Sequence, residues 1–196
     1  MCATLDYYEQ YAARFAADTL DVDMSALHDR FLAELLLAQI LDAGCGSGRD
    51  SRAFLQRGHV VHAIDASPAM ARIASANIGQ EVEVLRIEEL EASPRYDGIW
   101  ACASLLHLPE QAIPSALQRL WAALRPGGVL YLSFKHGEGE HQEAGRQFTD
   151  ATETRLRTWS VELEVHPCTP APLYWTTHVL IDRRPVVRRS AREPGA

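Results

Sequence analysis

Residues 40–50 read ILDAGCGSGRD and place three alternating glycines shortly after an acid. Gly44, Gly46 and Gly48 allow a tight turn and let a ligand touch the main chain, because glycine has no Cβ atom. A helix that opens near Ser47 would point its positive N-terminal end at the same ligand. The stretch therefore predicts a strand, a ligand-binding loop and a helix in succession.

The segments around this loop alternate between strand-like and helix-like patterns as far as residue 135. Short apolar runs predict strands at residues 39–44, 59–65, 81–87, 96–104 and 129–135. Helical patterns separate these runs at residues 47–58, 67–79 and 109–128. Pro114 should mark a boundary or a kink in the last helix. The alternation predicts an α/β fold with a doubly wound, Rossmann-like, mostly parallel sheet and helices on both faces.

The flanking segments extend this pattern in both directions along the chain. Helices are expected at residues 6–18 and from about residue 24, before the first strand. After residue 135 the sequence predicts a polar loop at 136–147, a short helix at 150–159 and two strands at 161–166 and 176–182. We expect about seven strands, the last antiparallel, in a single domain spanning residues 1–196. Its parts would be covering helices at 1–38, a cofactor-binding core at 39–135, substrate-side elements at 136–183 and a basic tail at 184–196.

The composition of the 196-residue chain restricts the classes of protein to consider. Hydrophobic residues make up 47% and charged residues 23%, which is ordinary for one well-buried domain. The net charge of −7 argues against a general nucleic-acid binder, which needs a basic face. Four cysteines without a CxxC pair indicate a reduced intracellular protein rather than a disulfide scaffold or a metal site. With no secretory signal and no apolar run near ~20 residues, we expect a cytoplasmic protein without a membrane span.

An acid at the end of the second expected strand narrows the choice of ligand. Asp65 lies where one carboxylate can accept hydrogen bonds from both hydroxyls of a ribose. A nicotinamide dinucleotide would fit this far, but its fingerprint is GxGxxG rather than the GxGxG found here. Asp42 would also repel a pyrophosphate and attract an ammonium group, although it could instead cap the following helix. A nucleoside with a cationic amino-acid tail, S-adenosylmethionine, satisfies these observations.

Four motifs carry a family resemblance. ILDAGCGSGRD, together with AIDASPAM at 63–70, resembles the nucleoside-binding motifs of class I S-adenosylmethionine-dependent methyltransferases. YDGIWACASLLHLP at 96–109 and LRPGGVLYLSF at 124–134 are similar to that family's fourth- and fifth-strand segments. YYEQYAARFAADT at 7–19 is similar to the N-terminal helix of tellurite-resistance-type and other small-molecule methyltransferases. The resemblance implies transfer of a methyl group from S-adenosylmethionine to a small-molecule acceptor.

The resemblance also implies which residues bind the cofactor. The set is Tyr8, Tyr11, Asp42, Gly44, Cys45, Gly46, Asp65, Ala66, Met70, Ile87, Glu88 and Ala101. The glycine-loop backbone would hold the methionine portion, and Asp42 would favour its amino group. Asp65 would hold the ribose hydroxyls. Ala101 and the adjacent main chain would approach the sulfonium.

The adenine side and the first helix complete this expected set. Ala66 and Met70 would line the adenine pocket, although Met70 could equally belong to the core. Arg86 occupies a place where the family often has an acid, so adenine recognition would rest on the Ile87 backbone or on Glu88. Tyr8 and Tyr11 lie three residues apart, so their rings would share a helix face and close over the cofactor, or simply pack.

Methyl transfer from a sulfonium depends chiefly on positioning. It is an in-line displacement with a good leaving group, so a general base is needed only where the acceptor must lose a proton. His107 and His136, after the fourth and fifth strands, are the candidate catalytic residues, although a lone histidine is more often structural. The alternatives are an NAD(P)-dependent oxidoreductase and a cofactor-binding protein without transfer activity. We expect no metal, no nucleic-acid partner and no membrane partner, and a monomer or homodimer.

Overall fold

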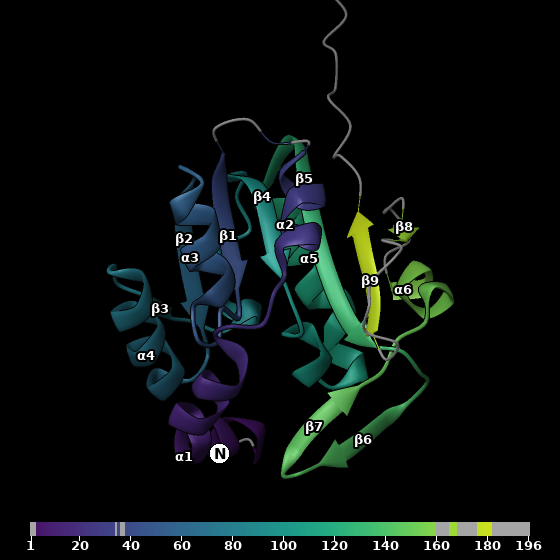
Figure 1. Cartoon of the computed structure of the whole chain (residues 1–196). Helices are drawn as coiled ribbons and strands as arrows, with labels where there is room; N and C mark the ends of the chain where they lie inside the picture. The colour runs from purple at the N-terminus through teal and green to yellow at the C-terminus, as the bar shows by residue number, and fades with distance from the viewer. Residues whose placement is uncertain (1–2, 34, 36–37, 160–164, 168–175, 182–196) are drawn as a thin grey trace, which may run out of the picture.

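The computed structural model describes residues 3–33, 35, 38–159, 165–167 and 176–181. Its main sheet contains the strands β1 (Gln39–Ala43), β2 (Val60–Asp65), β3 (Glu83–Val84), β4 (Tyr96–Ala101), β5 (Leu124–Lys135), β8 (Val165–Pro167) and β9 (Thr176–Ile181). Their spatial order is β3-β2-β1-β4-β5-β9-β8 (Figure 1). The first five strands pair in parallel, whereas β9 is antiparallel to both β5 and β8. These pairings confirm the expected Rossmann-like, mostly parallel sheet with an antiparallel last strand.

Helices cover both faces of this sheet, as the alternating sequence predicts. They are α2 (Ser25–Leu32), α3 (Arg49–Gln56), α4 (Pro68–Ile78), α5 (Ile113–Ala123) and α6 (Glu153–Trp159), whereas α1 (Ala3–Thr19) lies at the carboxyl ends of the strands (Figure 1). Neighbouring strand residues point to opposite faces, so Ile40 and Trp100 join one core cluster with α2, α3 and α4. Leu41 and Ile99 join the other cluster, with α5 and α6.

The ends of α4 follow from its flanking residues. Ser67 precedes the helix and its Oγ accepts a hydrogen bond from the Met70 N–H at 3.2 Å. Pro68 occupies the first turn, where a missing N–H costs nothing. Gly79 closes the helix in the left-handed region with φ 72°. Because β2 ends just before Ser67, this helix begins at the carboxyl edge of the sheet.

Two expected elements are shorter than the sequence predicts. The third strand pairs with β2 only at Glu83 and Val84 and gives way to a 3₁₀ turn, Ile87–Glu89, because β2 already ends at Asp65. The helix expected at 109–128 begins only at Ile113, after the 3₁₀ turn Glu110–Ala112, and ends at Ala123. Residues 124–128, expected to be helical, belong to β5 instead. Pro114 lies in its first turn and so marks the expected boundary.

The segment expected to be a polar loop forms a hairpin instead. β6 (Glu140–Glu143) and β7 (Arg146–Thr149) pair antiparallel through a turn at Ala144 and Gly145, both with positive φ. Two successive residues with positive φ are typical of a tight hairpin turn. The prediction was wrong because every residue of β6 is exposed, so its sequence lacks the apolar alternation that marks a half-buried strand.

Helix α1 and strand β7, which are far apart in sequence, meet at the carboxyl edge of the parallel strands. α1 contacts α4 and β7 there, below the strand ends in Figure 1. β1 lies between β2 and β4, so the connections on its two sides run in opposite directions. Such a switch point is where open α/β sheets bind ligands.

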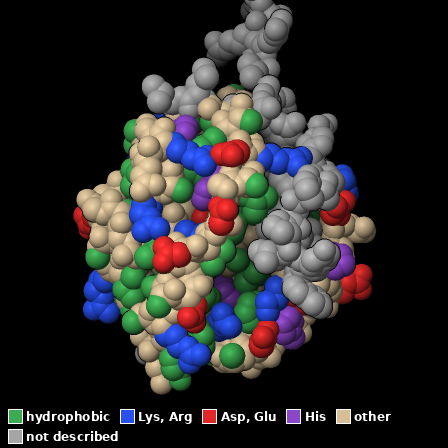
Figure 2. All heavy atoms as spheres, in the orientation of Figure 1, with side chains coloured by type: hydrophobic (Ala, Val, Ile, Leu, Met, Phe, Trp, Pro, Cys, Tyr) green, Lys and Arg blue, Asp and Glu red, His purple; other side chains and the backbone are tan. Residues whose placement is uncertain are grey.

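The surface of the described chain gives two further facts. Basic and acidic side chains are interspersed on the face shown in Figure 2, so that face has no large field of one sign. Within the described part of the chain, none of the helices has the length and hydrophobicity of a membrane span.

Candidate functional site

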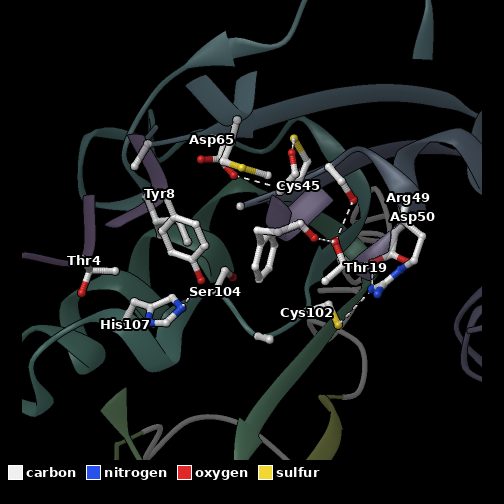
Figure 3. Close-up of a pocket in the computed structure, with 18 of the residues that line it drawn as sticks. Thr4, Tyr8, Thr19, Cys45, Arg49, Asp50, Asp65, Cys102, Ser104 and His107 are labelled. Carbon is white, nitrogen blue, oxygen red and sulfur yellow. Dashed lines mark hydrogen bonds and ion pairs between the residues drawn. The ribbon is translucent and has the colours of Figure 1, made fainter. Parts of the chain in front are cut away.

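A cavity of about 340 Å³ opens at the switch point, and α1 contributes part of its lining (Figure 3). One side, which we call the glycine-loop end, is lined by Gly44, Cys45, Gly46, Ser47, Asp65, Ala66, Met70, Leu85, Arg86, Ile87 and Glu88. The other side, which we call the histidine end, is lined by Thr4, Leu5, Tyr8, Ser104, His107 and Leu108. Between them lie Phe15, Thr19, Val22, Met24, Arg49, Asp50, Cys102, Ala103 and Ser133. The cavity therefore combines residues from the expected cofactor motifs with residues from α1 and the segment after β4.

The glycine loop is fixed to the neighbouring strand by its own backbone. The N–H groups of Gly44 and Cys45 both donate to the Ile64 carbonyl, each at 2.9 Å. Gly44 has φ +82°, and a Cβ atom added to it would lie 2.5 Å from Cβ of Ser104. Any larger residue would therefore be strained and would clash. This position needs glycine because the loop turns directly against the segment that follows β4.

Asp65 combines a fixed position with free hydrogen-bonding capacity. Its Oδ2 accepts from the Gly46 N–H and its Oδ1 from the Ser67 N–H, each at 2.9 Å. Burial raises the pKa of Asp65 to about 6, against the lowering effect of these two N–H donors. Each carboxylate oxygen can accept more than one hydrogen bond, so both can still bind ligand hydroxyls.

The remaining expected residues of the glycine-loop end also lie at the cavity. Cys45, Ala66, Ile87 and Glu88 line it beside Asp65. Met70 both lines the cavity and is 1% exposed, packed against α1. Met70 is therefore part of the packed core and also lines the cavity.

The histidine end contains a hydrogen-bonded chain whose direction is determined by its last member. Tyr8 Oη lies 2.8 Å from His107 Nε2, and His107 Nδ1 lies 2.8 Å from the Gln147 carbonyl (Figure 3 shows the first pair). A carbonyl only accepts, so Nδ1 carries the proton and Nε2 accepts from the Tyr8 hydroxyl. Burial, together with the charges of Arg146 and Lys135, lowers the pKa of His107 to about 4. The imidazole is therefore neutral near pH 7, and burial raises the pKa of its partner Tyr8.

Helix α1 is anchored at both ends of the cavity. Glu9 Oε1 accepts from Ser67 Oγ at 2.7 Å and from the Ala69 N–H at 2.9 Å, next to the glycine-loop end. Thr4 Oγ1 accepts from the Gln147 N–H at 2.9 Å, next to the histidine end. The helix thus spans the cavity and ties the core of the sheet to the hairpin.

Asp42 does not line the cavity, contrary to the expected contact with a ligand amino group. Its side chain is 1% exposed, and Ser51 Oγ donates to its Oδ2 at 2.6 Å. Burial and the neighbouring Asp50 carboxylate raise the pKa of Asp42 to about 8. The carboxyl group points from β1 into α3, where it supports the helix that follows the loop.

Three other expected residues also lie outside the cavity wall. Tyr11 is 41% exposed and packs on Tyr7, with ring centroids 5.0 Å apart, whereas Tyr8 packs on Phe15. Tyr8 and Tyr11 therefore do not share a face toward the site. Ala101 is fully buried as the last residue of β4, and the lining begins one residue later. His136 forms a bridge with Ala151 beside the hairpin and is not among the lining residues.

Several lining residues were not predicted from the sequence. Arg49 directly follows the last glycine, and its guanidinium donates two hydrogen bonds of 2.8 Å to Asp50. Although burial raises it, the donors His28 and Arg49 hold the pKa of Asp50 below its usual range. Arg49 could have been predicted from the sequence, because it is a basic residue at the start of the helix that follows the loop. Thr19 had no such signal, because it reaches the cavity only through the placement of α1.

Known proteins are similar in sequence to the part of the chain that contains the glycine loop. A family model described as a methyltransferase domain matches residues 40–128, which include the glycine loop and Asp65. A trans-aconitate 2-methyltransferase of Deinococcus radiodurans is 32% identical over 158 residues, which cover 78% of this chain and 56% of the relative. Residues 40–128 thus form a methyltransferase domain, as the resemblance to the class I S-adenosylmethionine-dependent methyltransferases implies.

Further comparisons extend the similarity from sequence to fold. A malonyl-[acyl-carrier protein] O-methyltransferase of Serratia marcescens is 33% identical over 144 residues, covering 68% of this chain and 55% of the relative. The chain thus spans about half the length of these curated relatives. The 1,6-didemethyltoxoflavin-N1-methyltransferase of Burkholderia thailandensis, solved with bound 1,6-didemethyltoxoflavin and S-adenosylhomocysteine, is 26% identical. Its TM-score is 0.71, over 91% of this chain and 85% of that chain.

A more distant structure shares the fold alone. Magnesium protoporphyrin IX methyltransferase from Synechocystis PCC 6803 is 18% identical, with a TM-score of 0.72 over 91% of this chain and 97% of that chain.

Proposed function

We propose that this methyltransferase transfers a methyl group from S-adenosylmethionine to a small-molecule acceptor. The observation that carries the proposal is that the glycine loop, Asp65 and the histidine end all line the same cavity. The Burkholderia relative binds S-adenosylhomocysteine together with a small molecule, which supports one cavity for both ligands. When bound, S-adenosylmethionine supplies an activated methyl group on a sulfonium.

The residues of the glycine-loop end fit the cofactor. The loop backbone at Gly44 and Gly46 would hold the methionine portion. A Cβ atom at Gly44 would clash with Ser104, and Gly46 has a positive φ of 55° that favours glycine. Asp65 would accept from the ribose hydroxyls with the free capacity of its two oxygens. Arg49, which lines the cavity beside the loop, would face the carboxylate of the methionine portion. Adenine would lie among Ala66, Met70, Ile87 and Glu88, which line this side.

The residues of the histidine end would orient the acceptor and exclude water. Tyr8 and His107 form a neutral, hydrogen-bonded pair held by the Gln147 carbonyl. Leu5 and Leu108 add apolar surface on the same side. We propose that α1 and α2 (within residues 1–38) act as a cover over the core at 39–135, and that the hairpin belongs to the substrate side.

The acceptor branch and cellular setting stay predictions. The named relatives act on trans-aconitate, a malonyl group on acyl carrier protein, and 1,6-didemethyltoxoflavin, which supports a small organic acceptor. A tellurite-type acceptor, suggested by the first helix, stays a narrower prediction. The free thiols of Cys45 and Cys102 support a reduced, cytoplasmic setting.

Binding and turnover test the proposal separately. Isothermal calorimetry with S-adenosylhomocysteine, S-adenosylmethionine, NAD and NADP should show binding of the first two only. Binding of NAD or NADP without S-adenosylhomocysteine would overturn the proposal in favour of an oxidoreductase. Transfer of a radiolabelled methyl group to any small acceptor would then exclude a protein that binds the cofactor without transfer.

A further inference from the structure

A cavity-lining hydroxyl at the histidine end has no protein partner among the described residues. Ser104 Oγ is buried and makes no hydrogen bond there, although it lines the cavity. The preceding residue, Ala103, is held at φ 51° with its N–H bound to Ser133 Oγ at 2.8 Å. Both an unpaired buried hydroxyl and a left-handed alanine are unfavourable, and such features concentrate at ligand sites. Ser104 Oγ is thus a fixed hydrogen-bond donor with unused capacity.

Positive charge lies beside the same end of the cavity. Arg146 stacks on Tyr7, with its guanidinium carbon 4.5 Å from the ring centroid, and its buried Nε has no hydrogen-bond partner in the described chain. Lys135 Nζ lies 3.7 Å from the ring centroid of Phe148, which is two residues after Arg146 in β7. Lys135 is paired with Glu143, whose side chain is 57% exposed. Arg146 is not a lining residue, so it acts on the cavity through its charge.

The groups that line this end bind an anion better than they remove a proton. Burial is the main cause that lowers the pKa of His107 to about 4, and the charges of Arg146 and Lys135 act in the same direction, so their charge reaches the Tyr8–His107 pair. Nε2 of His107 already accepts from Tyr8, and the pKa of Tyr8 is raised by burial. An acceptor that is already ionised at neutral pH needs no base, and this end offers it a hydroxyl donor and positive charge.

We propose that the histidine end binds an acceptor carboxylate, with Ser104 Oγ as hydrogen-bond donor and Arg146 as the balancing charge, and that this carboxylate is methylated. The inference rests on the proposed function. A carboxylate oxygen supplies the electron pair for the new bond to the methyl carbon, while the carbon–sulfur bond breaks and its electron pair stays on sulfur. The products are a neutral methyl ester and neutral S-adenosylhomocysteine, and no proton is released. Leu5 and Leu108 favour an acceptor with an apolar body next to its carboxylate.

The test compares acids with their amides, which have the same shape but no charge. The probes are cinnamate, octanoate and trans-aconitate with the matching amides, added to the full chain loaded with S-adenosylhomocysteine for calorimetry. Turnover is followed with tritiated methyl groups, and an ester is recognised by release of labelled methanol in alkali. We expect at least one acid to bind at least about tenfold more tightly than its amide and to give alkali-labile label.

Substitutions at two positions connect this preference to the named residues. Ser104→Ala keeps the Cβ atom beside Gly44 and should weaken the acid by about tenfold or more. Arg146→Gln should reduce the acid-to-amide ratio, Arg146→Lys should restore part of it, and raised salt should reduce it in the wild type. Arg125→Gln is the matched control, because Arg125 pairs with Asp97 at the opposite edge of the sheet and should leave the ratio unchanged. Affinity for S-adenosylhomocysteine, measured on each variant, reports an intact fold.

Three results would overturn the inference while the proposed function stands. They are amides that bind as well as the acids, failure of every acid to bind the loaded protein, and acid affinity that is unchanged in both Ser104→Ala and Arg146→Gln. A wild-type protein that does not bind S-adenosylhomocysteine would instead contradict the proposed function itself.

Discussion

The two ends of the cavity are held together over very different distances along the chain. The glycine-loop end depends on contacts such as Gly46 N–H to Asp65, which are 19 residues apart. The histidine end depends on Tyr8 with His107, 99 residues apart, and on Thr4 with Gln147, 143 residues apart. The first end belongs to the core of the sheet, whereas the second forms where a helix and a hairpin meet. Cofactor affinity and acceptor choice should therefore respond to different substitutions.

The substitution with the largest expected effect lies where the two ends touch. Gly44→Ala should lower the free energy of unfolding by about 2–6 kcal/mol, because a left-handed alanine and a Cβ 2.5 Å from Ser104 add their costs. Gly58→Ala is the matched control, since Gly58 has φ +86° but no atom within 4 Å of an added Cβ. Urea denaturation should show a much smaller loss there. Equal losses in the two variants would mean that the contact between the ends carries no energy.

Acidification should weaken the histidine end selectively. A histidine in an unfolded chain has a pKa of ~6.5, whereas burial lowers that of His107 to about 4 in the fold. Between these values the unfolded chain binds more protons, so stability increases with pH and is lost as the pH falls from 6.5 toward 4. Relative to His107→Gln, the wild type should lose about 2–3 kcal/mol more between pH 7 and pH 4.5. Urea titrations that shift in parallel for both proteins would contradict a neutral His107.

At the glycine-loop end, Asp65 should dominate cofactor affinity. Asp65→Ala should weaken S-adenosylhomocysteine binding by about 1.5–3 kcal/mol, the usual range for hydrogen bonds to a charged group. Asp65→Asn should bind with intermediate affinity, because its side-chain oxygen still accepts. Calorimetry that finds an unchanged dissociation constant in a folded Asp65→Ala protein would exclude this residue from the site.

The smallest effect is expected for a single hydroxyl on α1. Tyr8→Phe removes the hydrogen bond to His107 and should cost about 0.5–1.5 kcal/mol of stability. Tyr11→Phe, at an exposed position on the same helix, should change stability by less than about 0.5 kcal/mol. Neither should alter S-adenosylhomocysteine affinity by more than about twofold. If Tyr8→Phe weakens the cofactor as strongly as Asp65→Ala does, the two ends act as one unit.

Sequence reasoning succeeded where the determining residues are close together in the chain. The alternating strands and helices follow directly from local patterns, and so does the placement of the glycine loop and Asp65 at one cavity. Asp42 was assigned to the ligand because its charge was considered without its direction in β1, which sends it toward Ser51.

The histidine end was only partly predictable, for a physical reason. Local patterns singled out His107 and Tyr8 separately but could not show that they meet, since that depends on how α1 crosses the sheet edge. The role of Gln147 needed the hairpin, whose exposed first strand has no apolar alternation. Ser104 became visible only through its missing hydrogen-bond partner.

The hydrogen bond between Thr4 and Gln147 also has a consequence for biosynthesis. A ribosome that adds roughly 5–20 residues per second makes β7 on the order of ten seconds after α1. During that interval the aromatic side chains of α1 have only the earlier part of the chain to cover them. Glu9 can already join Ser67 and Ala69 once α4 has emerged, so we expect α1 to dock there first. The hairpin then closes the remaining side as one of the later events in folding.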